Sequence, residues 1–171
     1  MAITLQARLA GTNSYLPTAE DRLEQYQEIY QNNYHRIYSL AFRMSGNELA
    51  AEDVVSDVFR RAFSLVASPS AELLDRALVR ELREQIPIGF LSLECSPISE
   101  STRIRGNVKR VHLEEAVGQL PATERLVFLM HDVEGYDHVR ISKTIGLSEA
   151  ESLRGLHQAR LRLRELLSRM F

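Results

Sequence analysis

The stretch from residue 113 to residue 167 most constrains how this chain can fold, because its apolar residues recur at the spacing of α-helices. These residues are Leu126, Val127, Met130, Val133, Val139, Ile141, Ile145, Leu153, Leu156, Leu163, Leu166 and Leu167. Gly135 and Gly146 interrupt the pattern, and Ser148 with Glu151 has the spacing of a capping box, which starts a new helix. A short helix, a glycine turn and a capped longer helix predict a helix-turn-helix.

The same stretch carries a family pattern. It comprises Leu120-Pro121, Glu124-Arg125, Val127-Phe128-Leu129, Glu134-Gly135, Ile141, Gly146, Leu156-His157 and Ala159-Arg160. These residues and their spacings resemble region 4, the promoter-recognition domain of bacterial sigma factors, and most closely the small extracytoplasmic-function (ECF) type. The resemblance implies a subunit of RNA polymerase whose last helix enters the major groove of promoter double-stranded DNA.

The predicted DNA-binding residues follow from this resemblance and from charge, because cationic side chains along a recognition helix can hold the DNA backbone. They are Arg140 and Lys143 on the first helix of the motif, and Ser148, Glu151, Ser152, Arg154, His157, Arg160 and Arg164 on the second. The family pattern usually has a threonine, a basic residue and an arginine where this chain has Glu151, Leu153 and Gly155. The framework of the motif is therefore kept while three usual DNA-reading side chains are replaced.

A second resemblance lies about seventy residues earlier, from Ala51 to Phe63. It is similar to the part of sigma region 2 that binds a coiled coil of the largest polymerase subunits, with Ser56 in place of the usual glutamine. Apolar residues form one helical face, and the predicted polymerase-binding residues fall largely off that face: Glu52, Asp53, Ser56, Asp57, Arg60 and Arg61. A row of carboxylates beside arginines offers charge complementarity to a charged helical pair.

Helix start signals indicate an all-α chain of two small helical domains. Thr18, Asn47 and Ser70 are predicted N-caps, and Gly46 is a predicted helix stop. We expect a tail over 1–17, a region-2-like domain over 18–86, a linker over 87–109 and a region-4-like domain over 110–171. The linker composition is rich in Pro, Gly and Ser, yet several apolar residues in it need a surface to pack on.

The helix predicted after Ser70 departs most from the family. The tryptophan and asparagine that sigma factors usually present there are replaced by Leu74 and Glu81, and the helix is nearly neutral by count. Tyr26, Tyr30, Tyr34 and Tyr38 recur every four residues, a spacing that favours half-buried packing over the stacking of nucleotide bases. Little in this part of the chain therefore predicts a single-stranded DNA site.

Charge is unevenly distributed along the chain. Residues 1–100 carry 9 Lys or Arg against 14 Asp or Glu, and residues 101–171 carry 12 against 9. An acidic first part and a basic second part are typical of a protein that binds another protein and also DNA, although ordinary surface charge gives the same count. No apolar run is long enough to span a membrane, and Cys95 has no cysteine to pair with, so we expect a cytoplasmic protein without membrane insertion.

Other chemistry is disfavoured. His131, Asp132, Glu134, Asp137 and His138 cluster within eight residues but lack the spacing that places two imidazoles on one helix face, so no metal site is predicted. No glycine-rich phosphate loop or nucleophile motif is present, and we expect neither a cofactor nor enzymatic activity. Two interpretations remain: a working ECF sigma factor that binds core RNA polymerase and promoter DNA, or a sigma mimic that binds an anti-sigma factor or the polymerase without melting promoters.

Overall fold

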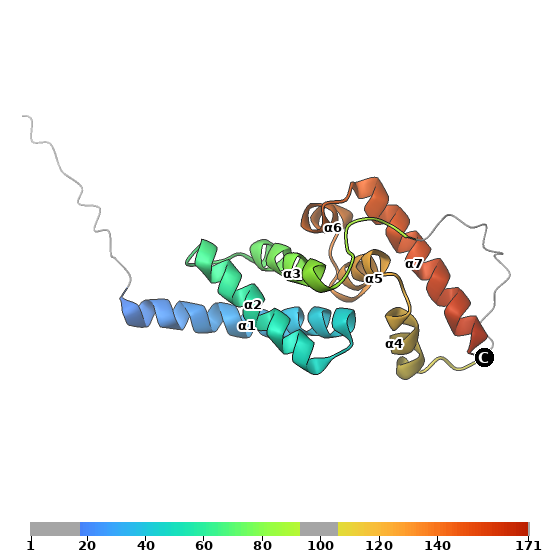
Figure 1. The fold of residues 1–171 in the computed structure, drawn as a ribbon, viewed down its shortest axis with the longest axis horizontal. Coiled ribbons are helices and arrows are strands. Elements are labelled where there is room, and N and C mark those ends of the chain that lie inside the picture. The colour runs from blue at the N-terminus through green and yellow to red at the C-terminus, as the bar shows by residue number, and fades with distance from the viewer. Residues whose placement is uncertain (1–17, 93–105, 171) are drawn as a thin grey trace, which may run out of the picture.

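The structure is a computed structural model that describes residues 18–92 and 106–170. Every regular element within those ranges is helical, so the predicted all-α fold is confirmed (Figure 1). The predictions made for the tail 1–17 and for Cys95 lie outside the described residues. In the same ranges, no helix combines the length and the apolar character needed to cross a membrane.

The first helical group consists of α1 (Ala19–Ser45), α2 (Glu48–Leu65) and α3 (Ala71–Gln85), which pack against one another. The predicted caps are confirmed, since the side chains of Thr18, Asn47 and Ser70 each accept a backbone N–H in the first turn of the helix that follows. In Figure 1 the first part of α1 extends beyond the other helices.

The second helical group consists of α4 (Arg110–Gly118), α5 (Ala122–Phe128), η1 (Leu129–Val133), α6 (His138–Ile145) and α7 (Glu149–Arg169). The π-helical turn η1 continues α5, and α7 packs against α4, α5 and α6. Figure 1 shows α6 and α7 meeting at a sharp turn.

That turn is the helix-turn-helix expected from the sequence. Gly146 ends α6 with φ of 79°, in the left-handed region that glycine adopts without strain, and its N–H donates to Ser142 O over 2.7 Å. Two residues later Ser148 starts α7 through a capping box with Glu151. Local chemistry therefore fixes the geometry of the motif.

The aromatic residues of α1 pack on α2. The ring centroids of Tyr26 and Phe63 lie 4.3 Å apart and those of Tyr30 and Phe59 lie 4.7 Å apart, while Tyr34 donates to Glu52 Oε1 over 2.8 Å. The interpretation of this stripe as half-buried packing therefore agrees with its contacts.

Candidate functional site

The outer face of α7 carries a cationic stripe. Its exposed side chains near the motif are Leu153, Arg154, His157, Arg160 and Arg164. Arg154, His157, Arg160 and Arg164 recur every three or four residues, which places them on one side of the helix. This face is therefore the part of the motif that can meet a duplex, and four of the predicted DNA-binding residues lie on it.

Ser148 and Glu151 have a structural role at the start of α7. Ser148 Oγ accepts from Glu151 N at 3.1 Å, and Glu151 Oε2 accepts from Ser148 N at 2.8 Å. The hydrogen bonds from the backbone and hydroxyl of Ser148 lower the pKa of the Glu151 carboxyl. The capping box thus explains the glutamate that stands where the family usually has a threonine.

Ser152 and Gly155 lie on the inner side of α7. Ser152 is fully buried, and its hydroxyl oxygen lies 2.9 Å from Nδ1 of His138 on α6. Its side chain is therefore not on the surface that faces solvent, and Ser152 leaves the set of residues that we propose to contact DNA. Burial is the leading cause that lowers the pKa of His138, followed by repulsion from His131 and Arg160.

Gly155 accommodates the first part of the linker. A Cβ placed on Gly155 would lie 2.8 Å from Cδ2 of Leu91, which is closer than side-chain carbons approach. The sequence comparison treated Gly155 as the loss of an arginine contact, but its missing side chain makes room for the linker. Nearby, Gly89 N donates to Thr123 Oγ1 over 3.1 Å and Ser92 N donates to Glu124 Oε1 over 2.5 Å.

We expect Gly155→Leu to lower the free energy of unfolding by about 1–3 kcal/mol, because the added side chain has to displace Leu91 from a packed site. Gly155→Ala should change it by less than about 1 kcal/mol, since the end of Leu91 can move and alanine favours the helix. Urea unfolding of both variants measures the difference. Equal stability of Gly155→Leu and the natural protein would show that Leu91 does not occupy this space.

Arg160 of the stripe forms a two-point salt bridge with Asp132. Its Nη2 donates to Asp132 Oδ1 over 2.6 Å and its Nε donates to Asp132 Oδ2 over 3.0 Å. Burial raises the pKa of the Asp132 carboxyl, but hydrogen bonds from Arg160 and His131 outweigh that effect and lower it. Asp132 therefore stays ionised and holds a guanidinium that remains about half exposed.

His131 and His138 lie side by side without forming a metal centre. Their rings stack with centroids 4.8 Å apart, and their Nδ1 atoms lie close to Asp132 and Ser152 respectively. Over the described ranges, no three His, Cys, Asp or Glu side chains converge as metal ligands do.

The two helical groups are joined by an ionic cluster around Asp75, which we call the Asp75 cluster: Asp75, Arg36, Tyr136 and Arg140. The Asp75 side chain is fully buried and forms salt bridges with Arg36 of α1 and, over 2.6 Å, with Arg140 of α6. The Tyr136 hydroxyl donates to Asp75 over 3.3 Å, and the Arg140 guanidinium lies 3.7 Å from the centre of the Tyr136 ring. One carboxylate of α3 is therefore held by cations from both groups.

Arg140 was predicted to contact DNA, and here it is engaged with Asp75, whereas Lys143 of the same helix is exposed. A second polar contact between the groups reinforces the arrangement, because Arg83 of α3 donates to the carbonyl oxygens of Ile145 and Ile88.

The near-neutral charge counted for α3 does not describe its surface. Asp75 and Glu81 are buried, whereas Arg76 and Arg80 are exposed.

The predicted polymerase-binding residues of α2 divide into two sets. Glu52, Asp53, Ser56 and Arg60 are exposed, and Asp57 beside them pairs with Arg60 over 2.5 Å. Arg61 instead turns toward α3 and forms a salt bridge with the buried carboxylate of Glu81. The exposed surface is therefore a row of carboxylates ending in one arginine, and Arg61 fixes α2 to α3.

Sequence reasoning did not identify Arg36, Asp75 or Tyr136 as important residues. The available signal was Asp75 itself, a carboxylate between Leu74 and Ala77 on the apolar side of a predicted helix. A charged residue in that position requires a buried partner, but its partners Arg36 and Arg140 lie 39 and 65 residues away along the chain.

Comparison with known proteins agrees with this architecture. Residues 110–163 match the protein family Sigma-70, region 4, and residues 29–72 match Sigma-70 region 2. Together the two matches span more than half of the chain.

Two curated relatives are similar over most of this chain. The ECF RNA polymerase sigma factor SigE of Mycolicibacterium smegmatis is 23% identical over 159 residues, which cover 84% of this chain and 62% of SigE. The probable ECF RNA polymerase sigma factor SigI of Mycobacterium tuberculosis is 29% identical over 152 residues, which cover 77% and 52%. This chain therefore spans between half and two thirds of the length of these relatives.

A solved structure has a similar fold. It is the sigma factor RpoE in complex with the anti-sigma factor NepR from Bartonella quintana, with a TM-score of 0.60 and 18% identity over 84% of this chain and 97% of that chain. The helix-turn-helix, with its cationic face as far as Arg160, and the α2 row of carboxylates fall within the two matched segments. The chain belongs to the sigma-70 family, as a member of its extracytoplasmic-function group that carries both region 2 and region 4.

Proposed function

We propose that this protein is a sigma factor that binds core RNA polymerase and directs transcription initiation at specific promoters in the cytoplasm. The observation that carries the proposal is that one chain presents two separate exposed surfaces, each in the matching family segment. One is the row of Glu52, Asp53 and Ser56 on α2, and the other is the cationic face of α7. A sigma mimic without promoter activity has no need of the second surface.

The proposed DNA contacts are made by Arg154, His157, Arg160 and Arg164 along α7, with Lys143 of α6 beside them. All of these side chains are exposed, and arginines spaced along one helix face are suited to the phosphates that border a groove. Arg140 joins this set only when it leaves Asp75. An anti-sigma factor is a further candidate partner, because the structural neighbour RpoE was solved bound to one.

In vitro transcription with core RNA polymerase and a pool of promoters from the source genome tests the proposal. Specific transcripts that require the protein are the expected result. Polymerase binding without any transcript would instead favour a mimic that acts through protein contacts.

Arg160→Ala should weaken binding to duplex DNA and reduce the salt dependence of binding, because each phosphate contact releases a counterion. We expect the slope of log K against log salt concentration to fall in magnitude by about one for the lost contact. Fluorescence titration of the full chain against a mixed-sequence duplex at several salt concentrations gives this slope.

Arg22→Ala is the matched control, because Arg22 is an exposed arginine on α1, in the other helical group. Its slope should equal that of the natural protein. If Arg160→Ala also leaves the slope unchanged, α7 does not hold the DNA backbone through Arg160.

A further inference from the structure

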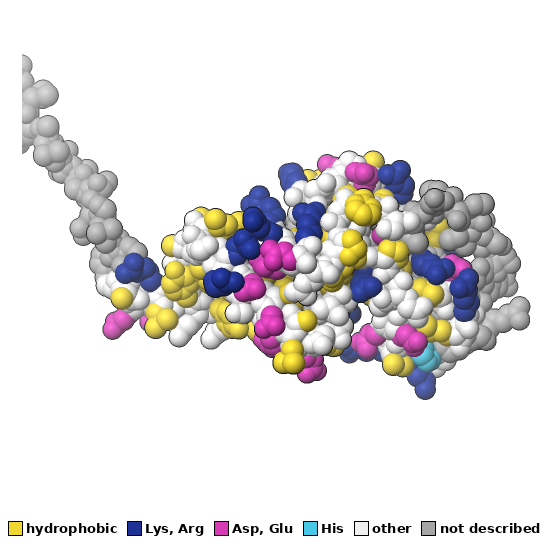
Figure 2. All heavy atoms as spheres, in the orientation of Figure 1, with side chains coloured by type: hydrophobic (Ala, Val, Ile, Leu, Met, Phe, Trp, Pro, Cys, Tyr) yellow, Lys and Arg dark blue, Asp and Glu magenta, His cyan; other side chains and the backbone are white. Residues whose placement is uncertain are grey.

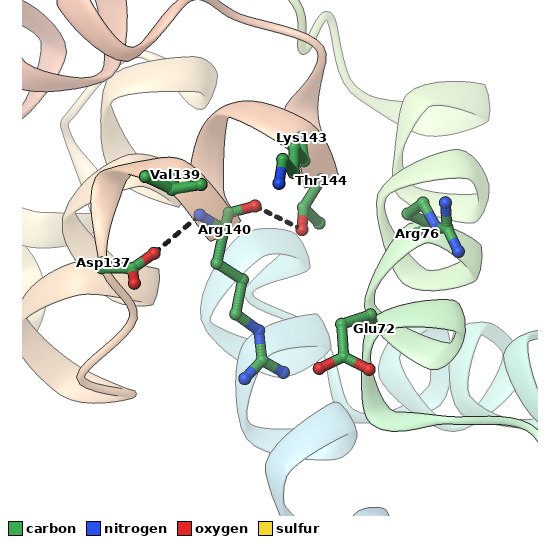
Figure 3. A pocket seen from close by; sticks show the side chains of 7 residues that line it. All are labelled: Glu72, Arg76, Asp137, Val139, Arg140, Lys143 and Thr144. Carbon is green, nitrogen blue, oxygen red and sulfur yellow. Dashed lines mark hydrogen bonds between the residues drawn. The ribbon is translucent and has the colours of Figure 1, made fainter.

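A cleft separates α3 from α6 at the contact between the two helical groups. Its volume is about 350 Å³. It is lined by Glu72, Arg76, Asp137, Val139, Arg140, Lys143 and Thr144 (Figure 3). We call it the cationic cleft, because three of its lining residues are cations contributed by both groups. Figure 2 shows Lys and Arg side chains gathered over the area where α3 and α6 meet.

Two of the three cations are available to a ligand. Arg76 and Lys143 are exposed, and neither forms a salt bridge with another residue in the described part of the chain. They stand on opposite walls, Arg76 on α3 and Lys143 on α6. Like charges that face one cleft repel each other, and an anion bound between them reduces that repulsion.

The third cation is held in place by its surroundings. Arg140 donates through Nη2 to Asp75 over 2.6 Å and stacks on the Tyr136 ring, while its Nε has no hydrogen-bond partner among the described residues. In Figure 3 its side chain extends from α6 toward Glu72 on α3. A guanidinium fixed in this way loses little conformational entropy when it meets an anion.

The two carboxylates that line the cleft are engaged at helix starts. Asp137 Oδ1 caps α6 by accepting from Arg140 N over 2.7 Å. A hydrogen bond from its own backbone N–H and one from Ser70 lower the pKa of Glu72, at the start of α3. The cleft is thus lined by three cations and two carboxylates, and both carboxylates are already engaged in hydrogen bonds at helix starts.

We propose that the cationic cleft binds a phosphate or diphosphate group. Arginine forks and a lysine ammonium are the side chains that hold phosphate oxygens, and a phosphate carries more charge than a carboxylate for the same size. Because Arg76 belongs to one helical group and Lys143 and Arg140 to the other, the site is complete only while the groups are in contact. Binding there therefore stabilises this arrangement by mass action.

Titration of the full chain with pyrophosphate at low salt, by calorimetry and by thermal unfolding, tests the site. We expect saturable binding with an increase in Tm, and about tenfold weaker binding for Arg76→Ser, which removes a charge-assisted hydrogen-bond donor. The matched control is Arg80→Ser, because Arg80 is an exposed arginine one turn further along α3 and does not line the cleft. It should bind pyrophosphate as the natural protein does.

A variant that is expected to bind more tightly separates an effect on the site from a loss of folding. Glu72→Gln removes a negative charge from the cleft wall, so pyrophosphate should bind several-fold more tightly. Equal affinities of the natural protein, Arg76→Ser and Arg80→Ser would overturn the proposal, and so would a titration without saturable binding.

The source of the phosphate is distinguished by a second ligand. Duplex DNA is titrated against the natural protein, Arg76→Ser and Arg80→Ser under the same conditions. If Arg76→Ser weakens the binding of both duplex DNA and pyrophosphate, and Arg80→Ser weakens neither, the bound group is a backbone phosphate of nucleic acid. If it weakens only pyrophosphate binding, the ligand is a free phosphorylated molecule.

Discussion

Asp75→Asn should lower the free energy of unfolding by about 3 kcal/mol, because it leaves two arginines without their shared counter-charge. Asp75 is fully buried, and the Arg36 and Arg140 side chains that pair with it are only 19% and 30% exposed. Because the two arginines are partly exposed, water solvates part of each charge. The expected loss in free energy of unfolding is therefore at the lower end of the range for a broken buried ion pair. Urea unfolding followed by circular dichroism measures it.

The matched control is Asp57→Asn, which removes the same charge from an exposed i,i+3 pair with Arg60. That pair should contribute less than about 1 kcal/mol. Small-angle scattering of Asp75→Asn should also give a larger radius of gyration, because the contact between α6 and α3 loses its ion pair and keeps, among the described residues, only the Arg83 hydrogen bond to Ile145 O as a polar link. A similar small loss for both variants, with an unchanged radius, would show that the Asp75 cluster does not join the two groups.

Asp53→Arg should abolish capture of the protein by core RNA polymerase. Asp53 lies at the centre of the exposed row between Glu52 and Ser56, and an arginine there reverses the charge that we propose the polymerase coiled coil meets. Like charges brought together at an interface cost several kcal/mol, which corresponds to a loss of affinity on the order of 100-fold or more. Co-elution with core polymerase in size-exclusion chromatography measures the capture.

Glu115→Arg is the control for this experiment, because Glu115 is exposed on α4 and the substitution changes net charge by the same amount. It should be captured normally. The Tm of Asp53→Arg should match that of the natural protein, since the Asp53 side chain is exposed and the fold does not depend on it. Normal capture of Asp53→Arg would place the polymerase contact elsewhere on the protein.

The sequence predicted the helices well because their ends depend on neighbouring residues. Thr18, Asn47, Ser70 and Ser148 were expected to cap helices, and each accepts the backbone N–H three residues ahead. Gly146 was expected to end a helix, and it ends α6 with a positive φ. Such signals lie within one turn of the helix that they start or end, so they can be read without knowledge of the fold.

The candidate site was predictable only in part. Helical periodicity shows which residues share a face of a helix, but not whether another part of the chain buries that face. Arg154 and Arg160 lie on the exposed side of α7 as expected, whereas Ser152, on the same helix, is buried beside His138. Arg61 was expected on the polymerase-binding surface and instead pairs with Glu81 of α3. In each case the deciding neighbour lies at least 14 residues away in the sequence.

The sequence by itself determined the helices, their caps, the helix-turn-helix and the family, all of which depend on local hydrogen bonding and on spacing along the chain. Only the tertiary structure decided that Asp75 joins both helical groups, that Gly155 makes room for Leu91, and that Arg76 and Lys143 face one cleft. These contacts join residues from distant helices. The sequence does not show which residue will pair with a buried charge or fill the space beside a glycine, because only packing brings the two together.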